Sequence, residues 1–454
     1  MPGSGQQYPN ARADRRLMSH QEPRPTQDAA ERAIVATLVL PNSAAAAAED
    51  PLEEISGLAE AAGADVVDGL YQRLPKINPR TAFGKGKVEE LAQLAKAREA
   101  TLLVVDYDLS PSQGRNLEKD MGIRVVDRTE LILDIFSTRA QTRQAKLQVE
   151  LAQMEYMKTR LKRMWTHLER TEGAIGSRGP GETQLETDRR LVNKKISDLK
   201  TRLKEIEGRR HRAAVSREFP YTVSLVGYTN AGKSSMLRRL TGADVFVADQ
   251  LFATLDTRIR SWRLEDGRQV ILADTVGFVR DLPHSLVASF HATLEETLNA
   301  DLLLHVVDAS APDLELHIEA VESVLAEVGT DGIPILLLLN KWDRVGEDDR
   351  LILQTRLPDA IPVSAHSSFG LEDLEAAIGS YLDAWSLHLE VEVPASDGRL
   401  LADFRRISRV ISEAYEDQKW IAELTLSPRH WSSLRGELLS QGGEFRVVGA
   451  QQSR

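Results

Sequence analysis

The feature that most constrains this chain is the run Gly227-Tyr228-Thr229-Asn230-Ala231-Gly232-Lys233-Ser234. It follows the apolar segment 222–226 and precedes a helical pattern that begins at Ser235. The run fits G-x-x-x-x-G-K-[ST], in which glycines let backbone N–H groups turn toward phosphate oxygens and the helix N-terminus adds positive potential. We expect Lys233 to pair with the β- and γ-phosphates and Ser234 to ligate Mg²⁺. Because the motif needs a strand, a loop and a helix in succession, it predicts an α/β domain with a mainly parallel sheet.

Two further segments follow apolar strand candidates and are expected to select the base: Asn340-Lys341-Trp342-Asp343 and Ser364-Ala365-His366. A carboxylate at Asp343 can accept hydrogen bonds from guanine N1–H and N2–H₂, whereas adenine offers no such donor pair. The stem of Lys341 can lie on the base, Asn340 can brace the loop, and a backbone N–H of 364–366 can meet guanine O6. In order behind the phosphate loop, these segments predict a site for GTP and GDP.

Two segments between these motifs are expected to close on the γ-phosphate: Phe252-Ala253-Thr254-Leu255-Asp256 and Asp274-Thr275-Val276-Gly277. Asp274 ends an apolar strand candidate and is expected to hold Mg²⁺ through water, and the Gly277 N–H to reach the γ-phosphate. Thr254 is expected to supply a second hydroxyl ligand to Mg²⁺. Such loops relax on hydrolysis, so the sequence predicts a switch as well as a catalyst, with Lys233, Thr254 and Gly277 as the catalytic set.

Two positions leave alternatives open. Phe278 stands where Ras-like GTPases place a glutamine that orients the attacking water, and a phenyl ring cannot hydrogen-bond that water. Either hydrolysis is slow until a partner supplies the missing group or orders the loop, or Phe278 only packs and another polar residue does this work. Asn230 resembles the phosphate-loop asparagine that coordinates K⁺ in potassium-activated GTPases; the alternative is a hydrogen bond that braces the loop.

Charge is distributed unevenly along the 454 residues, because the net charge is −11 while residues 137–218 carry 20 Lys and Arg against 11 Asp and Glu. In this block, apolar residues recur at alternating spacings of four and three over 147–168 and 192–206. The spacing predicts two long helices, joined by a glycine-rich loop and packed as an antiparallel hairpin. Its basic outer faces indicate either a nucleic-acid footprint or an ordinary solvated surface.

The remaining segments complete the prediction of a multidomain α/β chain. We predict a disordered tail over 1–30, a small α/β domain over 31–136, the basic hairpin arm over 137–218, a phosphate-loop domain over 219–387 and a small α+β domain over 388–454. In the last of these we expect a helix over 398–414 and a strand over 420–426.

The composition excludes several classes of protein. No cysteine is present, which excludes disulfide scaffolds, thiolate metal sites and cysteine nucleophiles. The longest apolar run, 333–339, is far shorter than the ~18 residues that a membrane span needs. With a polar N-terminal segment and no apolar signal, we expect a cytoplasmic monomer that does not insert into membranes.

Over nearly its full length, the chain resembles the HflX family of ribosome-associated GTPases. Beyond the nucleotide motifs, including Asp274 to Phe278, the resemblance rests on three segments: Gly84-Lys85-Gly86-Lys87, Asp127-Arg128-Thr129-Glu130-Leu131-Ile132-Leu133 and Arg178-Gly179-Pro180-Gly181-Glu182-Thr183-Gln184-Leu185-Glu186. The family implies a Mg²⁺-dependent GTPase that binds the large ribosomal subunit and splits stalled or idle ribosomes, particularly under stress. It also implies that the ribosome stimulates hydrolysis and that the N-terminal domain and arm engage ribosomal RNA.

Five residues are candidates for RNA contact under this resemblance: Lys85, Lys87, Lys162, Arg163 and Arg178. Arg178 either contacts a phosphate or base or belongs to a capped turn between two helices. Lys85 and Lys87 either touch RNA or merely precede the helix expected from Val88.

The chain departs from the family pattern in two places. Asp256 is followed by Thr257 instead of the usual proline, which is expected to loosen the first switch segment. Ser235-Met236 replaces the more usual threonine and leucine, although Ser235 still offers a hydroxyl to the α-phosphate.

The sequence leaves two other functions to consider. One is a ribosome-assembly or RNA-remodelling factor, in which GTP only times the release of RNA. The other is a metabolic P-loop kinase, against which the 340–343 segment and the order of the switch segments argue.

Overall fold

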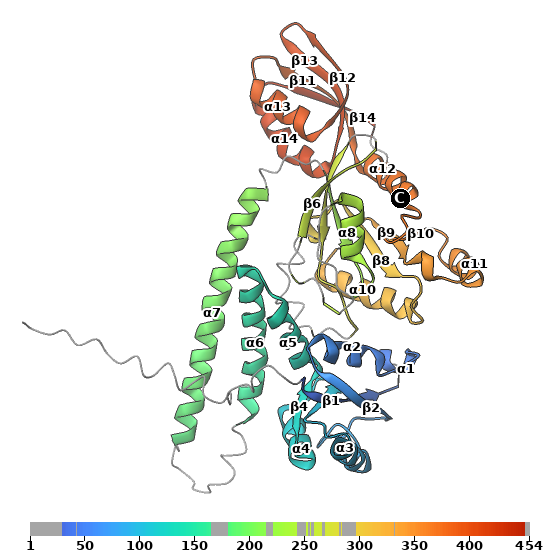
Figure 1. The fold of residues 1–454 in the computed structure, drawn as a ribbon. Helices are drawn as coiled ribbons and strands as arrows, with labels where there is room; N and C mark the ends of the chain where they lie inside the picture. Colours follow the sequence, from blue (N-terminus) through green and yellow to red (C-terminus); the bar gives the residue numbers. More distant parts are fainter. Residues whose placement is uncertain are drawn as a thin grey trace, which may run out of the picture.

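The computed structural model in Figure 1 describes residues 30–41, 43–164, 180–214, 221–242, 251–252, 255, 258–265, 268–280, 283, 297–330 and 332–449. Along the chain they form an N-terminal α/β domain, two long helices, a central α/β domain and a C-terminal α+β domain. No helix among these residues is both long and apolar enough to cross a membrane.

The N-terminal domain is a parallel sheet in the order β2-β1-β3-β4, with helices on both faces. Its elements are β1 (Arg32–Val39), α1 (Ala44–Ala47), α2 (Glu53–Ala61), β2 (Asp65–Arg73), α3 (Lys85–Ala97), β3 (Leu102–Asp106), α4 (Pro111–Met121), β4 (Arg124–Asp127) and α5 (Arg128–Arg139). Alternate residues of β1 are buried on opposite faces: Val35 packs with α2 and α5, and Ile34 with α3 and α4. Both faces are therefore covered, as a parallel sheet requires.

Strands and helices alternate in this domain, which agrees with the small α/β domain predicted here, but one helix starts earlier than expected. Helix α3 begins at Lys85, three residues before the start expected from the sequence, so Lys85 and Lys87 lie in its first turn. Lys87 pairs with Glu90 at 2.7 Å, and Lys85 lies 3.9 Å from Glu89.

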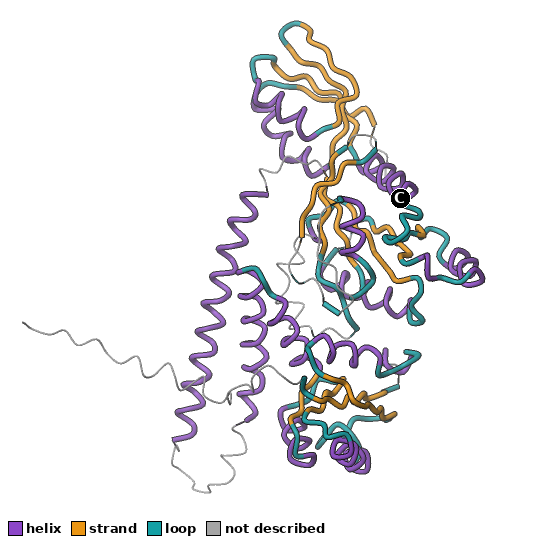
Figure 2. The backbone as a smooth tube through the Cα atoms, in the orientation of Figure 1, coloured by secondary structure: helices purple, strands orange, loops and turns teal. Residues whose placement is uncertain are grey.

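The two long helices expected from the heptad-like spacing are α6 (Arg143–Met164) and α7 (Pro180–Ala214). They lie side by side in Figures 1 and 2. They share an apolar cluster of five buried residues: Leu147, Leu151, Ile196, Leu199 and Leu203. Lys195 and Lys200 of α7 pair with Glu150 and Glu155 of α6, each at 2.8 Å. Among the candidate RNA contacts, Arg178 lies outside the described residues, as do the side chains of Lys162 and Arg163.

The central domain is a six-stranded sheet in the order β10-β9-β8-β5-β7-β6. Its elements are β5 (Tyr221–Val226), α8 (Lys233–Thr241), β6 (Arg258–Arg263), β7 (Gln269–Asp274), β8 (Leu302–Asp308), α10 (Leu314–Val328), β9 (Ile335–Asn340), the 3₁₀ turn Trp342–Arg344, α11 (Glu347–Arg356), β10 (Ile361–Pro362) and α12 (Leu371–Trp385). The mainly parallel sheet predicted for this domain is confirmed, because β5, β7, β8, β9 and β10 pair in parallel. Strand β6 was not predicted; it is an antiparallel edge strand whose arginine-rich sequence buries only Trp262, so it lacks an apolar pattern.

The C-terminal domain is an antiparallel sheet in the order β12-β13-β11-β14. Its elements are β11 (Leu387–Pro394), α13 (Gly398–Ile407), β12 (Arg409–Glu416), β13 (Lys419–Leu426), α14 (Pro428–Ser440) and β14 (Glu444–Gly449). The helix predicted over 398–414 was wrong beyond Ile407, because residues 409–416 pair with β13 as a strand. Val410 and Ile411 are β-branched and fit an edge strand once that partner is present.

The N-terminal and central domains share one apolar cluster. Phe136 of α5 meets Phe252 edge-on, with ring centroids 4.7 Å apart and an interplanar angle of 79°. Leu255, Phe278 and residues of α2 and α5 belong to the same cluster. The N-terminal domain thus packs directly against Phe252 and Leu255 of the first switch segment and against Phe278, which follows the second.

Candidate nucleotide-binding site

The phosphate loop connects β5 to α8 and depends on two glycines. A Cβ on Gly227 would lie 2.2 Å from the carbonyl oxygen of Val306, and one on Gly232 would lie 2.2 Å from Asn340 Nδ2. Gly232 also has φ of 95°, in the left-handed region. It ends the loop at a helix start without a side-chain cap, so the N–H groups of the first turn of α8 are available to an anion.

Lys233 lies buried at the first position of α8, with 6% of its surface exposed. Its Nζ donates to the carbonyl oxygens of Gly227 at 3.0 Å and Tyr228 at 2.7 Å. Burial lowers the pKa of Lys233 to about 8, against the opposing effect of the Asp274 carboxylate. Burial removes the water that would stabilise the ammonium of Lys233. A phosphate bound here would stabilise it instead, through its negative charge.

Two predicted Mg²⁺ ligands meet beside this lysine. Ser234 Oγ donates to Asp274 Oδ2 at 2.7 Å, and Asp274 is fully buried at the end of β7. A hydroxyl and a carboxylate oxygen in contact are the donors that Mg²⁺ prefers, so this pair fits the ion. The third predicted ligand, Thr254, lies outside the described residues, as do Ala253 and Asp256. Thr275, next in sequence to Asp274, is buried and donates to Leu225 O at 2.7 Å.

The second switch segment, which begins at Asp274, lies against the phosphate loop. Phe278 N donates to Gly227 O at 3.1 Å, and Phe278 O accepts from Thr229 N at 2.7 Å. A Cβ on Gly277 would lie 2.7 Å from Thr229 Cγ2 and 3.1 Å from Lys233 Nζ, so Gly277 is close to the place of the phosphates. The Phe278 ring is 2% exposed in the interdomain cluster, which agrees with the packing interpretation of this residue.

Asn340 joins the three loops of the site. It is 1% exposed, its Nδ2 donates to Ala231 O at 2.8 Å, and its Oδ1 accepts from Ala365 N at 3.1 Å. The structure therefore confirms the bracing contact expected of Asn340. Phosphate loop and base loops are held at a fixed spacing.

Asp343, which is predicted to select the base, has a carboxylate that accepts a hydrogen bond from the neighbouring base loop. Ser364 Oγ donates to Asp343 Oδ1 at 2.5 Å, and this hydrogen bond lowers the pKa of Asp343. Lys341 has φ of 59° and its Nζ pairs with Asp308 Oδ2 at 2.7 Å, which fixes its stem beside the loop.

Other predicted site residues pack into apolar clusters or lie exposed at the ends of their loops. Trp342 is buried in an apolar cluster with Val307 and Leu339, and Phe252 and Leu255 pack in the interdomain cluster. His366 is exposed at the end of its loop. Ser235 is half-buried in the first turn of α8, and Val276 is buried in the interdomain cluster. Asn230 is exposed, with φ of 60°.

Sequence reasoning missed the side-chain role of Tyr228. Its hydroxyl donates to Glu54 of α2 and accepts from Arg280 N at 2.9 Å, and its ring stacks on His317 with centroids 4.0 Å apart. The motif places Tyr228 inside the phosphate loop, but no local sequence pattern links a loop tyrosine to a glutamate of another domain.

The chain matches three family models and several known proteins. Residues 49–137 match the family model described as GTP-binding GTPase N-terminal, 139–217 the GTP-binding GTPase Middle Region, and 222–341 the 50S ribosome-binding GTPase. GTPase HflX of Magnetococcus marinus is 44% identical over 430 residues, covering 93% of this chain and 99% of the relative. GTPase HflX of Escherichia coli is 44% identical over 373 residues, covering 81% and 87%. A GTP-binding protein from Sulfolobus solfataricus, solved with GDP, is 25% identical with a TM-score of 0.41, covering 77% of this chain and 98% of its own.

Proposed function

Because the chain belongs to the HflX family of GTPases, we propose that it is a GTP-driven switch that binds the large ribosomal subunit and splits stalled or idle ribosomes, particularly under stress. The chain is a GTP hydrolase of the P-loop class. The observation that carries the proposal is that Asn340 holds three loops together. Its side chain joins the phosphate loop at Ala231 to the base loop at Ala365, so the distance between the two loops is fixed. The nucleotide then sets the state of the segments that pack against the N-terminal domain.

Magnesium is part of this proposal. Ser234 and Asp274 would hold the ion, Asp274 through water, with Thr254 as the third predicted ligand. When bound, Mg²⁺ would supply positive charge to the phosphates; Lys233 and the N–H of Gly277 would stabilise the remaining negative charge. The contact between Ser234 Oγ and Asp274 Oδ2 supports this assignment.

A potassium ion at Asn230 is a separate proposal. The side chain stands at an exposed loop position beside the phosphate site, which supports access by an ion. Hydrolysis rates measured in KCl and in NaCl at equal ionic strength test it. A faster rate in KCl supports the ion, and equal rates leave Asn230 as a loop-bracing residue only.

The arm and the N-terminal domain supply the RNA-binding surface. We propose that α6 and α7 form an antiparallel hairpin, and that Lys162, Arg163 and Arg178 are among the residues of this arm that contact RNA. In the N-terminal domain, Lys85 is the stronger candidate because its side chain is 88% exposed, whereas that of Lys87 is 22% exposed and paired with Glu90. Phosphate contacts of this kind weaken steeply as salt rises.

A sucrose-gradient profile separates ribosome splitting from the assembly or RNA-remodelling alternative. Protein added with GTP to intact ribosomes should raise the free-subunit peaks, and protein with GDP should not. If intact ribosomes stay unchanged while the protein still cosediments with large subunits, the assembly or remodelling function replaces splitting. Ser234→Ala, which removes a Mg²⁺ ligand, is the matched inactive control.

A further inference from the structure

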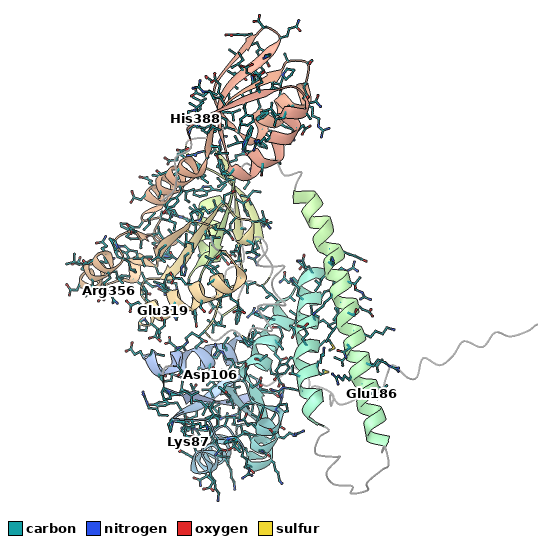
Figure 3. All side chains as sticks on the ribbon, turned by 180° about the vertical axis from the view of Figure 1, so that it is seen from behind. Lys87, Asp106, Glu186, Glu319, Arg356 and His388 are labelled. Atoms are coloured by element: carbon teal, nitrogen blue, oxygen red, sulfur yellow. The ribbon has the colours of Figure 1, made fainter. Side chains whose placement is uncertain are left out.

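A cluster of buried charge lies where the N-terminal domain meets the central domain. Glu54 of α2, Asp106 at the end of β3 and Arg128 at the start of α5 come from the N-terminal domain, and Arg280 comes from the second switch segment. Their side chains are 6%, 10%, 5% and 8% exposed. Arg128 pairs with both Glu54 and Asp106, and Arg280 Nε pairs with Glu54 Oε2 at 2.8 Å. Figure 3 marks Asp106 on the side of its domain that faces the central domain.

Three different groups of Arg280 are held at once. Its side chain binds Glu54, its backbone N–H donates to Tyr228 Oη at 2.9 Å, and its carbonyl oxygen accepts from Arg128 Nη2 at 2.6 Å. Two of these partners belong to the N-terminal domain and the third belongs to the phosphate loop. The second switch is therefore clamped between the nucleotide loop and the other domain, two residues beyond the Phe278 pairing described above.

The residue before Arg128 makes the matching contact with the arm. Asp127 caps α5 and is 2% exposed; its carboxylate accepts from Tyr156 Oη at 2.8 Å and pairs with Arg160, both on α6. The Arg160 guanidinium lies over the Tyr156 ring, 4.4 Å from its centroid. Two consecutive residues thus contact the second switch on one side and the first helix of the arm on the other.

Two features distinguish this cluster from a simple domain contact. Apolar packing around Phe136 and Phe252 already joins the domains, and a buried ionic cluster is a poor substitute for such packing because each charge must be desolvated. Arg280 Nη1 and Arg128 Nε are also buried without a hydrogen-bond partner in the described part of the chain. A buried donor without a partner costs free energy, so a rearrangement that supplied partners would stabilise these two groups.

We propose that Glu54 and Arg128 are positioning residues of the GTPase site, because they restrain the second switch segment through Arg280. Asp127, through its contacts with α6, couples movement of that segment to movement of the arm. GTP draws Gly277 toward the γ-phosphate, which breaks the pairing of Phe278 with the phosphate loop and moves Arg280. Because one removed partner leaves an uncompensated buried charge, the cluster shifts as a unit. Coupling of this kind is reciprocal. If GTP changes the affinity of the arm for its partner by some factor, binding of that partner changes the affinity for GTP by the same factor.

This inference rests on the proposed function, since it assumes a protein that binds both GTP and GDP, and one experiment separates the two. The chain has no cysteine, so Ser197→Cys on α7 and Gln354→Cys on α11, both exposed, take a donor and an acceptor dye without background. The transfer efficiency between them is measured in GDP and in guanosine 5′-(β,γ-imido)triphosphate. Binding of each nucleotide is followed separately with fluorescent analogues.

We expect the labelled parent to change its transfer efficiency between the two nucleotides, and Glu54→Gln and Tyr156→Phe to lose that change while still binding both. Glu60→Gln removes the same charge from the exposed face of the same helix and should keep it. Tyr107→Phe is the matched hydroxyl control in the N-terminal domain. Glu54→Gln should also lower the stimulation of hydrolysis by large subunits about tenfold, the scale of one charge-assisted hydrogen bond used for coupling.

The outcomes divide cleanly. A parent that binds both nucleotides with one constant transfer efficiency overturns the inference and leaves nucleotide binding intact. So does a Glu54→Gln or Tyr156→Phe protein that keeps the full change. A parent that binds neither nucleotide overturns the proposed function instead. Tyr156→Phe removes one oxygen atom from a half-buried residue, so it serves if Glu54→Gln fails to fold.

Discussion

Nucleotide affinity should depend on pH through Lys233. In the free protein, burial lowers the pKa of Lys233 to about 8, and its Nζ has only the carbonyl oxygens of Gly227 and Tyr228 as described hydrogen-bond partners. A bound β,γ-phosphate stabilises the ammonium and raises this pKa, so binding takes up a proton above pH 8. Affinity is complete below the free-protein pKa and falls as pH rises through it. About nine-tenths of the lysine is charged at pH 7 and about one-tenth at pH 9, which predicts about tenfold weaker GDP binding.

The assay is a titration with a fluorescent GDP analogue between pH 6.5 and 9.5 at constant ionic strength. Lys233→Arg is the control, because a guanidinium stays charged over this range. Any ionisation of the base affects both proteins, so the difference between the two profiles isolates the lysine. His305, also buried near Lys233, has its pKa lowered to about 4 by burial and then by the lysine charge, and stays neutral throughout. Parallel profiles for parent and variant would refute the argument.

Four further predictions concern the base loop, two glycines and the arm. Asp343→Asn should weaken GTP binding about a hundredfold, the loss of two charge-assisted hydrogen bonds at about 1.5 kcal/mol each, and should improve binding of xanthosine triphosphate; isothermal titration with both nucleotides checks this. Gly227→Ala should abolish GDP binding, because the new Cβ would lie 2.2 Å from a backbone oxygen of β8. Gly114→Ala, with nothing within 4 Å of its Cβ inside helix α4, should instead raise the free energy of unfolding by about 0.5–1 kcal/mol in a urea titration. Lys162→Glu with Arg163→Glu should reduce cosedimentation with large subunits, increasingly so as salt rises, while GDP affinity stays unchanged.

The nucleotide site could be predicted from the sequence because its parts are local. A phosphate loop needs fixed residue types at adjacent positions, and the close approaches at Gly227 and Gly232 leave no other choice of residue. The bracing role of Asn340 followed from its place at the end of an apolar strand, and the structure confirms it. Parallel strands that are buried on both faces can also be predicted, because their sequences are nearly continuous apolar runs.

Features that depend on distant partners could not be predicted. Glu54 and Arg280 are 226 residues apart, and the sequence around either residue gives no indication that the two side chains form an ion pair. Strand β12 was predicted as part of a helix because its residues form a strand only against β13. Edge strand β6 was missed because three of its six residues are arginines and only Trp262 is buried, so its sequence shows no apolar alternation.

Cosedimentation with purified large ribosomal subunits tests the central claim most directly. The protein should pellet with the subunits when loaded with guanosine 5′-(β,γ-imido)triphosphate and Mg²⁺, and should remain largely in the supernatant with GDP. Equal recovery in the supernatant with both nucleotides, at low salt and with nucleotide binding verified, would contradict the account.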